Sequence, residues 1–195
     1  MRIYDPESDD VKGYHKLLVL DLDETLVHAC GRPLGRKPDF AVGRYSVYRR
    51  PHLDAFLEGV FSAFEEVGVW TAGTLPYATP VLDRILDRER LSFVWGRERC
   101  TRKFDYETGE DVLLKPIRKL RQTGFRKEEI LYVDDSPEKI AQSYSNLVPI
   151  RPYVGDLSDG ELPLVLSYLH KLGPLGDVRP VEKRWWRNQL DRESG

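Results

Sequence analysis

The sequence predicts an α/β fold, in which helices flank an open, mostly parallel sheet that also carries a small β insertion. Two observations lead to this prediction. Uninterrupted apolar runs at 16–20, 67–72 and 130–133 have the length and composition of strands buried on both faces of a sheet. Stretches with helical periodicity separate these runs, and such alternation implies right-handed crossovers between parallel strands. Side chains that carry chemistry are therefore expected where the strands end.

The first half of the chain continues this alternation. A Gly-, Pro- and Arg-rich stretch follows the first strand and leads to an outlying strand at 44–50. Pro51 begins a helix whose apolar residues recur with helical spacing over 53–64, and Gly68 is typical of a helix end. The next strand is followed by a second helix, in which Pro80 predicts a kink or a late first turn.

The second half begins with shorter polar and aromatic runs. We interpret residues 91–112 as a small β insertion, with a hairpin turn at Thr108 and Gly109. Helices are then expected at 115–122, after Pro137 and at 162–172, with a strand at 146–150. Residues 1–175 are predicted to form one domain and 176–195 a charged tail. We expect Trp185 and Trp186 of this tail to pack back on the domain, the alternative being that they dock a partner.

Composition excludes several classes of protein. The 195 residues are 41% hydrophobic and carry a formal net charge of −2, so disorder over the whole length is excluded and nucleic acid is not favoured as a partner. No apolar run reaches the 18 or so residues of a membrane span, and the acidic N-terminus does not resemble a signal peptide. We therefore expect a cytoplasmic protein, or a nuclear one if the source is eukaryotic. Cys30 and Cys100 are far apart and are expected to be reduced thiols.

Four acidic residues follow two of the buried strands. Asp21 and Asp23 come after the first strand, and Asp134 and Asp135 end the strand at 130–133. A turn capped by an aspartate explains the first pair taken alone. With the second pair at a neighbouring strand end, the four acids indicate an oxygen site suited to Mg²⁺, which prefers carboxylates, water and phosphate.

Thr71 and Lys115 supply the hydrogen-bond donors and the positive charge that the four acids lack. A phosphoryl group carries about two negative charges, so its oxygens need cationic and hydrogen-bonding partners. Thr71 lies at the end of the second strand and Lys115 at the start of a helix, and both side chains are suitable donors. Lysines are most often solvated, and only its position distinguishes Lys115.

These residues lie in motifs that resemble a known family. The segment from Asp21 to His28 is similar to the first motif of haloacid-dehalogenase-superfamily phosphatases, specifically the FCP/SCP-like group that dephosphorylates the C-terminal domain of RNA polymerase II. The resemblance extends over roughly 16–172. Its other motifs are Val47–His52, Trp70–Gly73 with Tyr77, Arg97–Cys100, Lys115 and Tyr132–Pro137.

The resemblance implies a fold, a reaction and roles for individual residues. The fold would be an open parallel sheet without a large cap. Asp21 would be the nucleophile that forms an aspartyl phosphate, and Asp23 the general acid and then the general base. The residues implied in binding the phosphoryl group are Thr71, Ala72, Lys115 and Arg97. Those implied in holding Mg²⁺ are Asp21, Asp23 through its backbone carbonyl, and Asp135 as the favoured direct ligand, with Asp134 behind it near Lys115.

The substrate is expected to be a phosphorylated protein or peptide. Relatives specific for the polymerase tail carry an aromatic and an apolar residue that form a proline pocket, whereas this chain has Gly31 and Thr74 at those positions. The basic loop that contains Arg32, Arg36 and Lys37 leaves open a small metabolite or a nucleic-acid end as the substrate. A peptide-binding scaffold without catalysis is the remaining alternative. His28 and His52 are expected to have packing or helix-end roles, and Tyr77 either a core position or a place at the site entrance.

Overall fold

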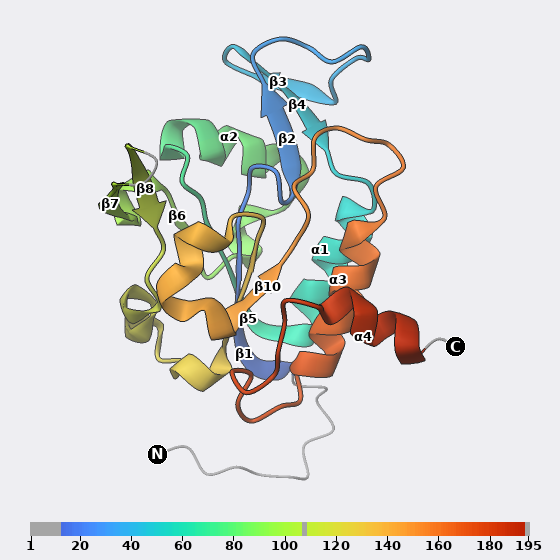
Figure 1. Ribbon diagram of the computed structural model, residues 1–195. Coiled ribbons are helices and arrows are strands. Elements are labelled where there is room, and N and C mark those ends of the chain that lie inside the picture. Colours follow the sequence, from blue (N-terminus) through green and yellow to red (C-terminus); the bar gives the residue numbers. More distant parts are fainter. Residues whose placement is uncertain (1–12, 107–108, 194–195) are drawn as a thin grey trace.

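The computed structural model describes residues 13–106 and 109–193, and its centre is a five-stranded parallel sheet (Figure 1). The strand order is β10-β9-β1-β5-β6. The strands are β1 (Tyr14–Leu20), β5 (Phe64–Trp70), β6 (Phe93–Trp95), β9 (Ile130–Asp134) and β10 (Leu147–Pro149). Because β1 is the middle strand and pairs in parallel with both β9 and β5, the residues after these three strands meet at one edge. The predicted α/β fold with a parallel sheet is confirmed.

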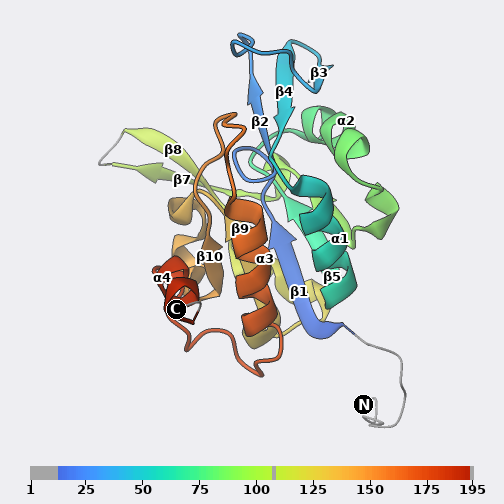
Figure 2. The same cartoon turned by 90° about the vertical axis from the view of Figure 1, so that its right-hand side faces the viewer.

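The sheet is buried on both faces, as its apolar strands require. Along β1, Leu18 and Leu20 belong to one hydrophobic core, whereas Leu17 and Val19 belong to a second core on the opposite face. Figure 2 shows α1 and α3 lying against the first face. The helices are α1 (Leu53–Ala63), α2 (Leu75–Ile85), α3 (Glu161–Leu172) and α4 (Trp186–Glu193), and the 3-10 segments are η1 (Arg88–Arg90), η2 (Arg97–Arg99), η3 (Ile117–Thr123), η4 (Lys127–Glu129) and η5 (Pro137–Asn146). Within the described ranges, none of these helices is both long enough and apolar enough to cross a bilayer.

Two small antiparallel sheets extend from this centre. The first has the order β2-β4-β3 and lies beyond the edge where β1 ends (Figure 1). Its strands are β2 (Val27–Cys30), β3 (Phe40–Val42) and β4 (Tyr45–Arg49). Only β4 was expected from the sequence, because β2 and β3 flank a Gly-, Pro- and Arg-rich stretch and are too short to show a pattern. The second sheet is the hairpin of β7 (Thr101–Asp105) and β8 (Glu110–Leu114).

The structure corrects two of the expected boundaries. Phe93–Trp95, which we assigned to the β insertion, pairs in parallel with β5 as the edge strand of the main sheet, so the hairpin begins at Thr101. Of the predicted turn residues, Thr108 lies outside the described residues and Gly109 has a positive φ of 72°. Gly68 does not end a helix but lies inside β5, where a Cβ would collide with the ring of Phe93. Glycine is needed there for close packing rather than for a helix cap.

The C-terminal segment packs against the domain through one of its two tryptophans. The indole of Trp186 is fully buried, stacks on Tyr168 at 5.3 Å between ring centroids, and donates a hydrogen bond of 2.8 Å to the carbonyl of Pro149. Trp185 is 66% exposed, so the expectation that both indoles pack back was wrong for this residue. The hydrophobic core therefore includes Val178 and Trp186, which lie beyond residue 175.

Candidate active site

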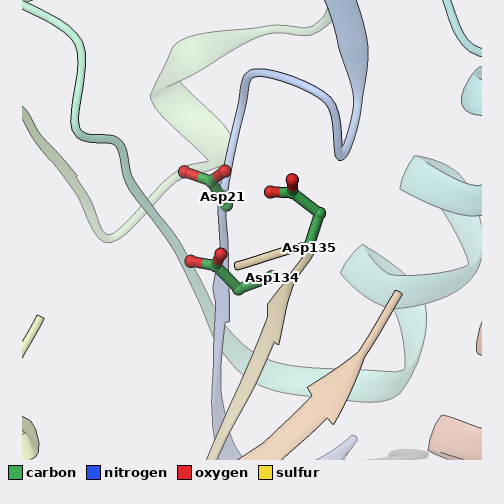
Figure 3. A group of neighbouring side chains, drawn as sticks. All are labelled: Asp21, Asp134 and Asp135. Carbon is green, nitrogen blue, oxygen red and sulfur yellow. The ribbon is translucent and has the colours of Figure 1, made fainter. Parts of the chain in front are cut away.

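Three carboxylates converge at the edge where β1 and β9 end. Asp21 directly follows β1, Asp134 is the last residue of β9, and Asp135 comes next. One oxygen atom from each residue lies within 4.8 Å of the others. Figure 3 shows the three side chains from the two neighbouring strands pointing toward one another. The parallel register produces this cluster, since the amide of Asp21 donates to the carbonyl of Val133 at 3.0 Å and continues the strand pairing.

Lys115 supplies the positive charge inside this cluster. Its Nζ lies 2.6 Å from Oδ1 of Asp21 and 2.5 Å from Oδ2 of Asp134, and all three side chains are almost fully buried. Burial opposes the charge on the ammonium group, but the two carboxylates outweigh it and raise the pKa of Lys115. The amine is therefore charged at neutral pH. Lys115 follows β8 directly, and its amide donates to the carbonyl of Lys139 at 2.8 Å, which fixes its position.

The remaining oxygens of the cluster suit a divalent cation. Oδ2 of Asp21 is buried and accepts no hydrogen bond, whereas Asp134 has both oxygens engaged, one with Lys115 and one with the amide of Ser136 at 2.9 Å. Asp135 is partly exposed, and burial together with the nearby charge of Asp21 raises its pKa to about 6. The orphaned carboxylate oxygen of Asp21 beside the partly exposed carboxylate of Asp135 is a donor set that a hard cation such as Mg²⁺ can fill.

Asp23 lies beside the cluster but faces other partners. The hydroxyl of Tyr77 donates to its Oδ1 at 2.5 Å and that of Thr71 to its Oδ2 at 3.4 Å. Burial raises the pKa of Asp23 above its usual value, the hydrogen bond from Tyr77 opposes this shift, and the charge of Asp21 adds to it. A carboxyl group with a raised pKa is suited to hold and then donate a proton. The Asp23 side chain is not one of the three convergent carboxylates.

The strand end after β5 contributes the other residues expected at the site. The hydroxyl of Thr71 accepts a hydrogen bond from the amide of Gly73 at 2.9 Å, which orients the Thr71 side chain toward Asp23. Nε of Arg97 donates to the carbonyl of Ala72 at 3.0 Å, so the guanidinium is held beside this turn. The structure therefore brings Thr71, Ala72 and Arg97 to the same edge as the carboxylates.

An open cleft leads to these residues. It has a volume of about 370 Å³ and lies between the β2-β4-β3 sheet and the start of α2. Its lining consists of Asp23, Glu24, Ala29, Tyr45, Gly73, Thr74, Tyr77 and Arg97. The rings of Tyr45 and Tyr77 meet edge to face with their centroids 5.4 Å apart and form an aromatic wall. Tyr77 thus lines the entrance and also packs against the hydrophobic core, so it combines the two positions that the sequence left open for it.

Sequence reasoning missed three residues of this site. Burial and the charges of Asp23 and Asp21 raise the pKa of Glu24 to about 7. Lys139 is half-buried, and its charge lowers the pKa of both Asp23 and Asp135. Tyr45 reaches the cleft only because β4 pairs with β2. Lys139 lies four residues after Asp135, on the 3-10 segment η5. This spacing was the one signal in the sequence for a role of Lys139, and it can be interpreted only once the strand ends are known to meet.

His28 and His52 lie in surroundings different from those of the carboxylate cluster. His28 is half-buried, and its Nδ1 lies 3.2 Å from Oε1 of Glu24. His52 precedes α1 in the left-handed conformation, with a φ of 65°. Neither belongs to the carboxylate cluster, and the position of His52 fits the expected role at a helix end.

Comparison with solved structures supports the fold. The structure of a fission yeast RNA polymerase II CTD phosphatase bound to beryllium fluoride is similar with a TM-score of 0.53, at 20% identity, over 94% of this chain and 50% of that one. An uncharacterized protein from Listeria monocytogenes also gives a TM-score of 0.53, at 17% identity, over 82% of this chain and 99% of that one. The first match shows that the chain shares the fold of that phosphatase.

Comparison of sequences identifies the family. Nuclear envelope morphology protein 1 of Schizosaccharomyces pombe is 34% identical over 85% of this chain, and a CTD small phosphatase-like protein of Homo sapiens is 31% identical over 89%. The chain spans 35% of the first relative and 62% of the second. The family model of the NLI interacting factor-like phosphatase matches residues 16–179. This chain therefore belongs to the NLI interacting factor-like phosphatase family.

Proposed function

We propose that the domain hydrolyses phosphomonoesters through an aspartyl phosphate, with Asp21 as the nucleophile. The observation that carries the proposal is the state of the Asp21 carboxylate. One of its oxygens is held by the charged Lys115, and the other is buried without a partner. The ammonium group offsets the charge of the carboxylate, and the orphaned oxygen is free to form a bond.

In the first step, a carboxylate oxygen of Asp21 attacks the phosphorus atom while the bond from phosphorus to the ester oxygen breaks. Asp23 gives its proton to the departing oxygen, which leaves as an alcohol. Thr71, Lys115 and Arg97 stabilise the oxygens of the transferring phosphoryl group, as charged and hydroxyl donors do in other phosphoryl transfers. Before substrate binds, the ammonium group of Lys115 is shared between the carboxylates of Asp21 and Asp134. When the phosphoryl group binds, this ammonium group turns toward the phosphoryl oxygens.

In the second step, water attacks the phosphorus atom of the aspartyl phosphate and releases inorganic phosphate. Asp23, now ionised, accepts the proton of this water, and the bond between phosphorus and Asp21 breaks to restore the carboxylate. The hydrogen bonds from Tyr77 and Thr71 hold Asp23 in one place for both proton transfers. One residue can therefore act as acid and then as base.

We further propose that Asp21, Asp135 and the backbone carbonyl of Asp23 hold a Mg²⁺ ion. Asp134 is engaged with Lys115 and Ser136, which supports a role in which it positions Lys115 behind the ligands and does not bind the ion directly. When bound, Mg²⁺ would neutralise charge on the phosphoryl group and between the carboxylates. Removal of divalent ions with EDTA is expected to abolish phosphate release from 4-nitrophenyl phosphate, and added Mg²⁺ to restore it. Equal turnover with and without EDTA would contradict this assignment.

A phosphoserine or phosphothreonine side chain within a polypeptide is the substrate class that we propose. The cleft is open and walled by the aromatic rings of Tyr45 and Tyr77, which suits an extended segment. One relative, at 32% identity, is named as a small phosphatase of the RNA polymerase II C-terminal domain. Here Thr74 lines the cleft where relatives specific for the polymerase tail carry an apolar residue, so a proline next to the phosphate is not expected to be required.

A panel of substrates tests this class directly. Phosphoserine and phosphothreonine peptides, with and without proline after the phosphorylated residue, are compared by kcat/KM with nucleotides and sugar phosphates. We expect the peptides to be preferred over the small molecules. A preference for nucleotides or sugar phosphates would favour the small-molecule or nucleic-acid-end alternative, and no hydrolysis of any of them would favour a scaffold.

Replacement of Tyr77 by phenylalanine tests the support of Asp23. The variant keeps the ring against Tyr45 but loses the hydroxyl that donates to Asp23. A hydrogen bond to a charged group contributes about 1.5–3 kcal/mol, so kcat/KM is expected to fall by about tenfold or more. Steady-state kinetics with a phosphopeptide measures the effect. Unchanged kinetics would mean that Asp23 needs no such support.

A further inference from the structure

A buried arginine lies behind the turn that carries Asp23. Arg50 follows β4, and its side chain has no exposed surface. Its Nε and Nη2 each donate to one oxygen of Asp159 at 2.8 Å, Nη2 also donates to the carbonyl of Arg151 at 2.8 Å, and Nη1 donates to the carbonyl of Thr25 at 3.1 Å and that of Glu24 at 3.4 Å. The guanidinium has five N–H groups, which matches these five contacts. Arg50 therefore joins the loop at 151–159 to the turn directly after Asp23.

The turn itself has an unusual backbone. Glu24 has a φ of 58°, in the left-handed region that residues other than glycine rarely adopt. Such a conformation persists only where the surroundings over-determine it. The amide of Glu24 donates to the carbonyl of Val27 at 2.7 Å, and its own carbonyl accepts from the amide of Tyr153 at 2.7 Å as well as from Arg50. Arg50 is thus one of the few groups that hold the turn in this conformation.

We propose that Arg50, held by Asp159, is a positioning residue that fixes the turn at Glu24 and so aims Asp23 at the reacting group. This inference rests on the proposed function, because it assigns Arg50 a role through the general acid. Arg50 itself is fully buried and lines no part of the cleft. If the Glu24 carbonyl is released, the left-handed φ of Glu24 can relax, and the backbone on the Asp23 side of the turn moves with it. The Asp23 carboxyl then loses its alignment with Tyr77, Thr71 and the leaving oxygen.

A misaligned acid has a kinetic signature that a general loss of stability lacks. Phenolate is more basic than 4-nitrophenolate, so its departure depends more strongly on a proton from the enzyme. We therefore compare kcat/KM for phenyl phosphate and 4-nitrophenyl phosphate, in the presence of Mg²⁺, for the unaltered protein and three variants. The variants are Arg50→Lys, Asp159→Asn and Arg187→Lys. A lysine at 50 keeps the charge but cannot span both oxygens of Asp159 and the two carbonyls of the turn.

Arg50→Lys is expected to lower kcat/KM for phenyl phosphate by about 10- to 100-fold, as small displacements of catalytic groups do, and to lower the value for 4-nitrophenyl phosphate less. Asp159→Asn should change the ratio of the two esters in the same direction by a smaller factor, and it decides the question if Arg50→Lys does not fold. Arg187→Lys is the matched control. Arg187 pairs with Glu161 and donates to the carbonyl of Pro149 at 3.3 Å. Among the described residues, it reaches the loop at 151–159 only through Glu161, and none of its hydrogen bonds joins the turn at Glu24.

The outcomes distinguish a failure of the positioning role of Arg50 from a failure of the proposed function. A changed ester ratio in the variants at 50 and 159, but not at 187, supports the positioning role. If the unaltered protein is active and the folded Arg50 and Asp159 variants keep its ester ratio, the positioning role is wrong while the proposed function stands. If the unaltered protein hydrolyses neither ester nor any phosphopeptide, the proposed function itself fails and the role of Arg50 in it fails too.

Discussion

Replacement of Asp21 by asparagine is expected to lower phosphomonoester turnover by about 10⁴-fold or more, the scale on which a lost nucleophile acts in other enzymes. An amide has nearly the size of a carboxylate and can still accept a hydrogen bond from Lys115, so the variant should fold. It cannot attack phosphorus, because its oxygen and nitrogen are poor nucleophiles. Phosphate release from a phosphopeptide, measured with Mg²⁺ on a variant whose thermal unfolding is cooperative, gives the result.

Asp83→Asn is the control for this experiment. Asp83 is a half-exposed carboxylate on α2 that pairs with Arg88 and does not belong to the carboxylate cluster. Its replacement changes the net charge by the same amount and should leave turnover unchanged. Substantial residual turnover in purified Asp21→Asn would exclude an aspartyl phosphate at this position.

Replacement of Lys115 by methionine is expected to reduce both stability and activity. The substitution removes the ammonium group that pairs with Asp21 and Asp134, each almost fully buried. Breaking a buried ion pair by removing one partner costs about 3–5 kcal/mol, because the remaining charge is left without compensation. Urea unfolding at neutral pH in EDTA measures this loss. Lys127→Met, at an exposed lysine, is the control and should change the free energy of unfolding by less than about 0.5 kcal/mol.

The loss in Lys115→Met should depend on pH and on Mg²⁺. Burial raises the pKa of Asp134, and loss of the lysine removes the positive charge that opposes this shift. In the variant the folded state therefore binds more protons than the unfolded state, so stability falls as pH rises. The variant is therefore expected to recover stability under acidic conditions. Mg²⁺ should also raise its melting temperature more than that of the unaltered protein, because the ion replaces the missing positive charge. A stability difference that neither pH nor Mg²⁺ alters would contradict the charge balance that we infer.

The layered fold was predictable because its strands are continuous apolar runs. In β1, the residues from Leu17 to Leu20 are almost fully buried and face the two cores alternately, which is what an uninterrupted run of Leu and Val indicates. Phe93–Trp95 was misplaced because an edge strand of three residues carries no periodicity. Gly68 was misread because a glycine required by a neighbouring ring has the same appearance in a sequence as a glycine that ends a helix.

The site was predictable where it depends on strand ends and not where it depends on contacts between distant segments. Asp21, Thr71 and Asp134 each follow or end a strand, so their meeting follows from the parallel order. The five contacts of Arg50 involve segments up to 109 positions away, and no local pattern indicates them. Family motifs did identify Lys115, whose place after the hairpin is equally remote in the chain.

The anchoring of Trp186 has a practical consequence for expression of this domain. The family match ends at residue 179, and a polypeptide trimmed to that boundary would lack the indole that stacks on Tyr168 and caps the last strand at Pro149. A recombinant polypeptide that ends there would expose an apolar patch and is expected to aggregate. Lack of activity in such a sample would then reflect poor folding rather than the absence of a catalytic mechanism. Expression should therefore run through α4.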